Sequence, residues 1–359
     1  MNRRLGSLAA AFGVTIAAAA VLTPASQPRA ASAELPVLDA HTHIIGGRNN
    51  AFFDEAVAAE LAMMGRYHIA KSIVMSPPRG EYYRLNFDYP QFMGAIGRHR
   101  DRFAFLGGGG LLNPMVHTIK PSAVTPAIKA KFTRLALQIL KAGAAGFGEM
   151  SSLHLSLAPE HGYNFAPADH PLLLLLADIA AAHDVPIDLH NDALLKAEPR
   201  PARFAGFQDP PILPATIAPL KRLLQHNPKA EIIWDHGGAD QAGDMTAQRV
   251  GAMMDRYPNL YMSLKPLPPN APGMNKLFSK HGLDAGWAAV IARHPDRFFI
   301  GSDNFYVPHH IRPDKAPVQF SRHDGEKMRA IRAFLKLLPA GLTPKIAYAN
   351  AERLFKLKL

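Results

Sequence analysis

Short apolar segments recur along the chain, and each is followed by a polar or glycine-rich patch and then by a stretch with helical spacing. Eight of the apolar segments have the length and composition of strands: "LPVLDAHTHI" from Leu35, "KSIVMS" from Lys71, "FAFLGGGG" from Phe103, "AAGFGEM" from Ala144, "VPIDLHND" from Val185, "EIIWDHGG" from Glu231, "LYMSLKP" from Leu260 and "RFFIGSDNF" from Arg297. Between them, apolar residues repeat with the period of a helix at 54–65, 126–142, 171–183, 214–226, 246–257 and 285–294. Strands that alternate with helices indicate a parallel sheet.

The alternation predicts an α/β fold, and eight strand–helix repeats favour a closed (β/α)8 TIM barrel. An open doubly wound sheet is the alternative, although no G-x-G-x-x-G fingerprint follows the first strand. The glycine run "LGGGGLLNP" at 106–114 lacks the Lys-Ser/Thr that ends a Walker loop. We interpret this run as a close approach of the backbone at a strand end.

The first 33 residues have the pattern of a targeting segment. Arg3 and Arg4 precede an apolar stretch of about 15 residues, and "ASA" at 31–33 matches a cleavage site. A membrane span needs about 20 apolar residues, so a retained anchor is only the alternative. We predict a signal peptide over residues 1–33, a single domain over 34–359 and a periplasmic or secreted location. Both Sec and twin-arginine export remain open.

Composition restricts the chemistry that this chain can carry out. The absence of cysteine excludes disulfides, thiolate metal sites and cysteine nucleophiles, so a metal would need nitrogen and oxygen ligands. The formal net charge is +11, but the basic residues are scattered and lack interleaved aromatics. We therefore expect a small-molecule substrate and no nucleic-acid partner.

Side chains that can bind a metal stand at the ends of five predicted strands. They are His41 and His43 on the first, then Glu149, His190, His236 and Asp303. The two histidines of the first strand are two residues apart and share a face. Active sites of (β/α)8 barrels lie at these strand ends. We therefore expect these side chains to meet there and to bind a divalent metal. Zinc fits best, with manganese, cobalt or iron as alternatives.

Asp39 shares the face of the two strand-one histidines, one step deeper. It either orients a ligand histidine or fills a buried hydrogen-bonding role. Lys265, at the end of the seventh strand, and Arg79, after the second, are candidates for substrate binding. The alternative for both Lys265 and Arg79 is a charged side chain in a loop that faces solvent and has no functional role.

The ordered motifs "LDAHTHI", "GFGEM", "DLHND", "WDHGG" and "IGSDNF" resemble the amidohydrolase superfamily, especially its amidohydrolase-related (amidohydrolase 2) branch. The terminal "KIAYANAERLF" resembles the helix that closes many members of that branch. The resemblance runs from about residue 35 to 359. It implies a metal-dependent barrel enzyme, and it allows a homodimer.

The resemblance also implies roles for individual residues. His41, His43 and His190 match metal ligands, and Asp303 matches a ligand that also accepts a proton from the nucleophilic water. His236 matches a histidine that binds a second metal in binuclear members and acts as an acid, base or protonated oxyanion stabiliser in mononuclear ones. Glu149 stands where some binuclear members have a bridging carboxylate. One or two ions are therefore compatible with the pattern.

The implied activity is hydrolysis, in which a metal-activated water attacks an ester, lactone or amide carbonyl, or a phosphoester. A metal-dependent decarboxylase of an unsaturated or aromatic carboxylic acid is the main alternative. Many decarboxylases of the branch lack a residue such as Glu149, which favours hydrolysis. A catalytically idle barrel and a metal-dependent deoxyribonuclease are weaker alternatives; in that nuclease family threonine usually precedes the final acid, whereas Asp303 follows serine.

Overall fold

Parallel strands dominate the computed structural model, which describes residues 34–47, 50–78, 87–157, 161–308, 310 and 325–359. The strands of its two larger sheets are ordered β16-β1-β2-β3 and β15-β12-β11-β8-β5-β4. Their bounds are β1 Val37–Ile44, β2 Ile69–Val74, β3 Phe103–Phe105, β4 Gly107–Gly108, β5 Phe147–Ser151, β8 Ile187–His190, β11 Ile232–Gly237, β12 Leu260–Leu264, β15 Phe298–Ile300 and β16 Asn304–Tyr306. The prediction of an α/β fold with parallel strands is confirmed.

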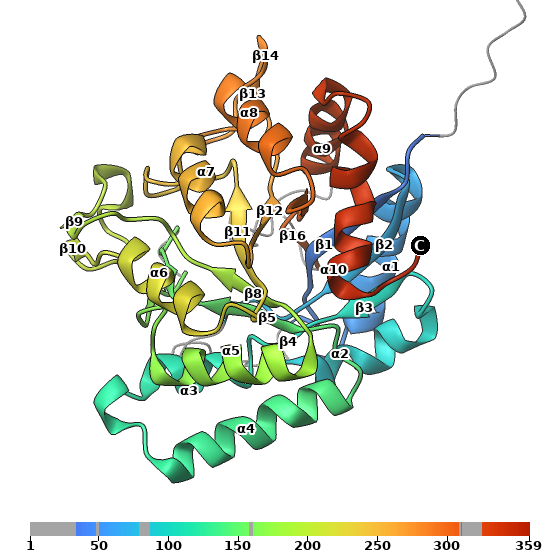
Figure 1. Ribbon diagram of the computed structural model, residues 1–359. Coiled ribbons are helices and arrows are strands. Elements are labelled where there is room, and N and C mark those ends of the chain that lie inside the picture. The colour runs from blue at the N-terminus through green and yellow to red at the C-terminus, as the bar shows by residue number, and fades with distance from the viewer. Residues whose placement is uncertain (1–33, 48–49, 79–86, 158–160, 309, 311–324) are drawn as a thin grey trace, which may run out of the picture. The chain divides into compact units, whose positions relative to one another are not determined.

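Helices follow most of the strands and lie around them in Figure 1. They are α1 Phe53–Arg66, α2 Tyr89–Ile96, α3 Asn113–Thr118, α4 Pro126–Lys141, α5 Pro171–His183, α6 Ile217–His226, α7 Ala247–Arg256, α8 Ala285–Arg293, α9 Glu326–Leu337 and α10 Asn350–Phe355. Three antiparallel pairs decorate the loops: β6 Leu153–His154 with β7 Asn164–Phe165, β9 Glu198–Pro199 with β10 Ile212–Leu213, and β13 Phe278–Ser279 with β14 Gly282–Leu283. Within the described ranges, no helix combines the length and the apolar character that a membrane crossing requires.

Helix α6 begins three residues later than the sequence pattern predicts. Thr216, which precedes the helix, is fully buried, and its side chain forms hydrogen bonds with the neighbouring loop. Its hydroxyl donates to the carbonyl of Asp192 at 2.7 Å and accepts from the amide of Leu194 at 2.9 Å. These contacts hold the chain in a non-helical path up to Thr216.

A compact cluster of buried apolar side chains packs the strands against the C-terminal helix α10. This cluster joins residues of four strands and two residues just outside strands to the C-terminal helix: Leu38, Ala40, Ile73, Met75, Leu106, Ile233, Phe299, Ala351, Leu354 and Phe355. The ring of Phe355 on α10 packs edge-on against Phe299 of β15, with centroids 5.9 Å apart. The terminal segment that resembles a closing helix therefore covers the amino ends of the strands.

The chain passes from one sheet to the other in two places, and the second passage positions Asp303. Residues 301–303 join β15 to β16, and the amide of Asp303 donates to the carbonyl of His41 at 2.9 Å. The carboxylate of Asp39 accepts from the amide of Ser302 at 2.8 Å. Asp39 therefore has the buried hydrogen-bonding role, because its contacts go to backbone amides and hold the turn before Asp303.

The four-glycine run binds a carboxylate of this chain. One oxygen of Asp88, which is buried, accepts from the amides of Gly108, Gly110 and Leu111, each at 2.9 Å. A Cβ on Gly109 would lie 2.5 Å from the carbonyl oxygen of Ser76. The interpretation of the run as a close backbone approach is confirmed.

Glu60 on α1 gives a prediction about pH and stability. The residue is fully buried, and burial raises the pKa of its carboxyl to about 8, against the opposing effect of the Ser72 hydroxyl. The folded state keeps this proton up to higher pH than the unfolded state, where the pKa is 4.5. The free energy of unfolding should therefore fall between pH 4.5 and 8, by on the order of 3–5 kcal/mol.

Chemical denaturation across this pH range checks the prediction for Glu60. Glu60→Gln should remove the part of the fall that Glu60 contributes and leave the part of Asp39 and Asp88, whose pKa values burial raises to about 6. The matched control is Glu55→Gln on the same helix, where the side chain is 46% exposed. A Glu60→Gln variant with the pH profile of the wild type would contradict the assignment.

Candidate metal centre

The two histidines of β1 point their Nε2 atoms at each other, 3.2 Å apart. The Nδ1 atom of His43 donates to the carbonyl of Met75 at 3.0 Å, which leaves the lone pair on Nε2. The Nδ1 atom of His41 lies 3.2 Å from a carboxylate oxygen of Asp188. A proton on each Nδ1 turns both Nε2 lone pairs toward one point, an arrangement typical of metal-binding histidines.

Two carboxylates approach the same point. Asp303 Oδ1 lies 3.2 Å from His43 Nε2. Glu149 Oε2 lies 3.4 Å from His41 Nε2 and 3.3 Å from His43 Nε2. We call His41, His43 and Asp303 the first group; each offers an atom within 4.8 Å of the others.

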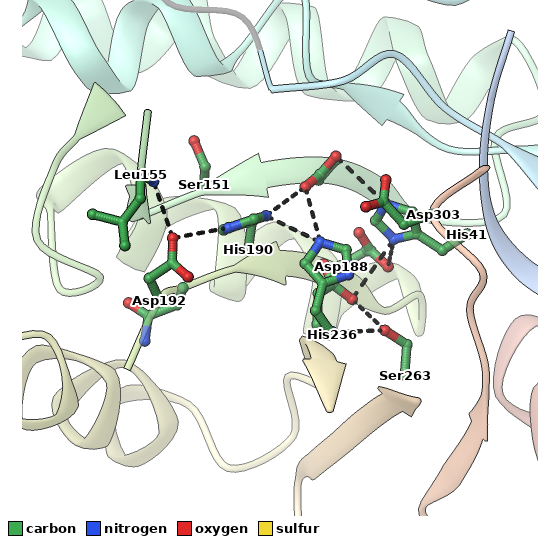
Figure 2. A network of polar contacts seen from close by, with 12 residues as sticks. His41, Ser151, Leu155, Asp188, His190, Asp192, His236, Ser263 and Asp303 are labelled. Atoms are coloured by element: carbon green, nitrogen blue, oxygen red, sulfur yellow. Dashed lines mark hydrogen bonds and ion pairs between the residues drawn. The ribbon is translucent and has the colours of Figure 1, made fainter. Parts of the chain in front are cut away.

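The other oxygen of Glu149 faces a second pair of histidines. Glu149 Oε1 lies 2.9 Å from His190 Nδ1 and 3.6 Å from His236 Nε2, and these two nitrogens are 3.1 Å apart. Figure 2 shows His190 between Asp192 and His236. We call His190 and His236 the second group. Glu149 therefore stands between two sets of nitrogen donors, with one carboxylate oxygen toward each.

The six strand-end residues gather as the sequence pattern predicts, in groups that overlap. His236 lies within reach of His41 and Glu149 as well as of His190, so it connects the two groups. The expectation that His190 shares a cation with the β1 histidines stays a prediction.

Carboxylates hold the rings of both groups. Asp188, which is fully buried, contacts His41, and a second buried carboxylate, Asp235, lies 3.8 Å from His41 Nδ1. Asp192 Oδ2 lies 3.3 Å from His190 Nε2 and also accepts from the amide of Leu155 at 3.0 Å. Such contacts fix which nitrogen of a histidine is free to bind a metal.

The carboxylates around the first group favour a positive charge at His41. Burial opposes protonation of His41, yet the charges of Asp188, Glu149 and Asp235 outweigh it and raise the pKa of His41 well above its usual range. A divalent cation would supply the same charge while leaving His41 neutral. Histidine nitrogens with carboxylate oxygens are ligands that suit zinc and related metals, so the residues present fit a metal.

Burial and the nearby Lys265 ammonium lower the pKa of His236 to about 4. His236 is therefore neutral at pH 7, which suits a metal ligand and differs from the protonated form expected of an oxyanion stabiliser. Lys265 forms an ion pair with Asp303. Burial raises the pKa of Asp303, but Lys265, Lys327 and His236 outweigh it and hold the pKa well below its usual range.

A family comparison agrees with this geometry. The family model described as Amidohydrolase (Amidohydro_2) matches residues 123–357, a stretch that includes Glu149, His190, His236 and Asp303. The chain belongs to the amidohydrolase family. The resemblance noted in the sequence is therefore confirmed. His41 and His43 precede the matched stretch, and their place in this amidohydrolase follows from the distances above.

Several solved structures match the chain at low identity. Amidohydrolase 2 from Bifidobacterium longum subsp. infantis is 12% identical, with a TM-score of 0.44 over 90% of this chain and 100% of that one. An amidohydrolase from Pseudomonas aeruginosa is 8% identical, with a TM-score of 0.46 over 90% and 96%. The inactive dihydroorotase-like domain of a Chaetomium thermophilum CAD-like multifunctional protein is 10% identical, with a TM-score of 0.45 over 90% and 80%. No curated protein matched.

A cavity opens beside both groups of this amidohydrolase. Glu149, His190, His236, Lys265 and Asp303 line it, together with an apolar side formed by Pro77, Pro78, Leu155, Leu157, Met245 and Phe305. Lys265, a candidate for substrate binding, is thus among the residues that line the cavity. Arg79, the other candidate for substrate binding, lies outside the described residues.

Sequence reasoning missed the carboxylates that hold the histidines. Asp188 precedes His190 by two residues and Asp192 follows it by two, so all three alternate along one extended stretch. The same rule that paired His41 with His43 would have flagged Asp188. His154 and His161, which also line the cavity, stand outside the regular strand pattern.

Asp188→Asn should weaken binding of a divalent metal by about 10- to 100-fold, because the amide no longer selects the Nδ1-protonated form of His41. Titration of the metal-free protein with Zn²⁺ measures the change. Asp178→Asn is the control, since Asp178 contacts the ring of His226 at 3.0 Å on the surface. Equal affinities in the two variants would contradict this role for Asp188.

Proposed function

We propose that this amidohydrolase is an exported, metal-dependent hydrolase that attacks an ester, lactone or amide carbonyl, or a phosphoester, of a small molecule. Residues 1–33 are the proposed signal peptide and 34–359 the proposed (β/α)8 barrel. The observation that carries the proposal is the position of Glu149, whose two oxygens face two different sets of histidine nitrogens. This arrangement suits two divalent ions with a bridging carboxylate.

The order of strand pairing supports the barrel. Strands β1, β2 and β3 pair in parallel, and Leu106 alone separates β3 from β4. The parallel pairings continue from β4 through β5, β8, β11 and β12 to β15. Residues 301–303 then lead into β16, which pairs with β1. The path from neighbour to neighbour thus returns to its start, as a closed barrel requires.

The residues of the site have separate tasks in the proposed reaction. A bound divalent metal lowers the pKa of a water molecule and polarises a carbonyl or phosphoryl oxygen. Asp303 accepts the proton of the attacking water and passes it to the leaving group. Lys265, paired with Asp303 at the cavity, keeps the carboxylate ionised and meets the substrate. Glu149 and His236 would hold the metal, and His236 is also the candidate for a second acid–base role.

Metal analysis and a substrate panel test the proposal. The full-length protein should purify with divalent metal, zinc being the expected ion, and should hydrolyse at least one member of a panel of aryl esters, lactones, amides and phosphoesters. Release of CO2 from aromatic or unsaturated carboxylic acids, without hydrolysis, would instead support a decarboxylase. Full activity in protein freed of metal would contradict both.

Cell fractionation tests the proposed export. The protein should appear in the periplasm or medium of a bacterial host, with Glu34 as its first residue. Retention in the cytoplasm with an intact N-terminus would contradict the signal peptide while leaving the proposed chemistry standing.

A further inference from the structure

His154 lies against the second group although it belongs to no parallel strand. It ends the short strand β6, directly after β5, and pairs with Asn164 of β7. The adjacent Leu153 is fully buried in a small apolar cluster with Phe204, which anchors β6. The ring of His154 lies 4.3 Å from that of His190, centroid to centroid, and lines the cavity.

One nitrogen of the His154 ring makes no hydrogen bond that would stabilise the described part of the fold. The Nδ1 atom of His154 is buried and lacks a hydrogen-bond partner among the described residues. An unsatisfied buried polar atom costs about 1–3 kcal/mol, and in native proteins it usually marks a functional group, a water or an ion. One nitrogen of His154 also lies within 4.8 Å of donor atoms of both Glu149 and His190.

We infer that His154 is an additional ligand of the ion in the second group. The inference rests on the proposed function and adds a fourth protein donor to Glu149, His190 and His236. Three nitrogens and one oxygen complete a tetrahedral shell for zinc. The ion of the second group would then be retained more firmly than three donors allow, and the loop that carries β6 would be tied to the metal.

The neighbouring His161 provides a matched control. Its ring centroid lies 4.6 Å from that of His154, and it lines the same cavity. Its Nδ1 atom, however, accepts from the amide of Leu157 at 3.0 Å, and His161 belongs to none of the described groups that could hold an ion. Replacing it perturbs the same loop without removing a proposed ligand.

The experiment compares wild type, His154→Ala and His161→Ala as full-length proteins loaded with Zn²⁺ or Co²⁺. Bound metal per chain is measured after dialysis against metal-buffered solutions, and the visible absorption of Co²⁺ reports the ligand set. His154→Ala should bind its second ion at least about tenfold more weakly and change the Co²⁺ spectrum. His161→Ala should keep two ions and the wild-type spectrum.

Two outcomes separate this inference from the proposed function. A wild type that binds no divalent metal would refute the proposed function, and the inference with it. A wild type with two ions, together with a His154→Ala variant of unchanged affinity and spectrum, would refute the inference alone. His154→Gln, which keeps a polar side chain, guards against loss of folding. If it is folded but loses both ions equally, the inference is likewise refuted.

Discussion

Asp303→Asn should lower kcat for the hydrolysed substrate by about 10²- to 10⁴-fold, the range expected when a positioned proton acceptor is lost. Asparagine has nearly the same shape as aspartate but cannot accept the proton of the attacking water. Its Oδ1 atom can still face His43 Nε2, which lies 3.2 Å from the aspartate oxygen. Most of the effect should therefore fall on kcat. Steady-state kinetics on a substrate found in the panel would measure it.

The control for this variant is Asp296→Asn. Asp296 precedes the amino end of β15, far along the strand from Asp303, and its exposed carboxylate pairs with Lys345 at 2.7 Å. This control should keep the wild-type kcat. If Asp303→Asn retains metal, folds normally and also keeps the wild-type kcat, then Asp303 does not carry the proton.

Glu149→Ala should have the second large effect, on metal content as well as on rate. Because its two oxygens face the first and the second group separately, their removal weakens both positions at once. We expect the purified variant to retain at most one ion per chain and to lose hydrolytic activity by at least about a hundredfold. Elemental analysis alongside the kinetic assay would show both losses.

Glu231→Ala is the matched control for Glu149→Ala. Glu231 precedes β11 at the amino ends of the strands and contacts the hydroxyl of Tyr261 at 3.1 Å. It should leave metal content and rate unchanged. A Glu149→Ala protein that still holds two ions would show that this carboxylate does not bridge them, and the case for hydrolysis over decarboxylation would lose its main support.

The alternation of apolar segments and helical stretches was enough to predict the parallel strands and to place His41, His43, Glu149, His190 and Asp303 at one edge. Each of these residues stands at the end of a strand, and neighbouring parallel strands follow one another along the chain. The sequence around each strand is therefore enough to place its end. Local patterns do not show how a strand end bends. The break between β15 and β16 and the delayed start of α6 both depend on hydrogen bonds to distant residues.

The division of the site into two groups also could not be predicted from the sequence. It depends on which way each ring turns, and the rings are turned by Asp188, Asp192 and the carbonyl of Met75. His154 follows a predicted strand end closely in the sequence, but the sequence assigns it no task for a related reason. It lies in a two-residue strand that has no periodicity, and only the pairing of β6 with β7 brings it to His190.

The hydrogen bonds from Ser302 to Asp39 and from Asp303 to His41 join segments that lie more than 260 residues apart in the sequence. Contacts between residues so distant along a chain are slow to form and come late in folding. During synthesis, therefore, the first histidine pair leaves the ribosome long before its partner carboxylate exists. Under the proposed export, a chain that crosses the membrane unfolded would complete the first cation site, and take up its ion, only after export.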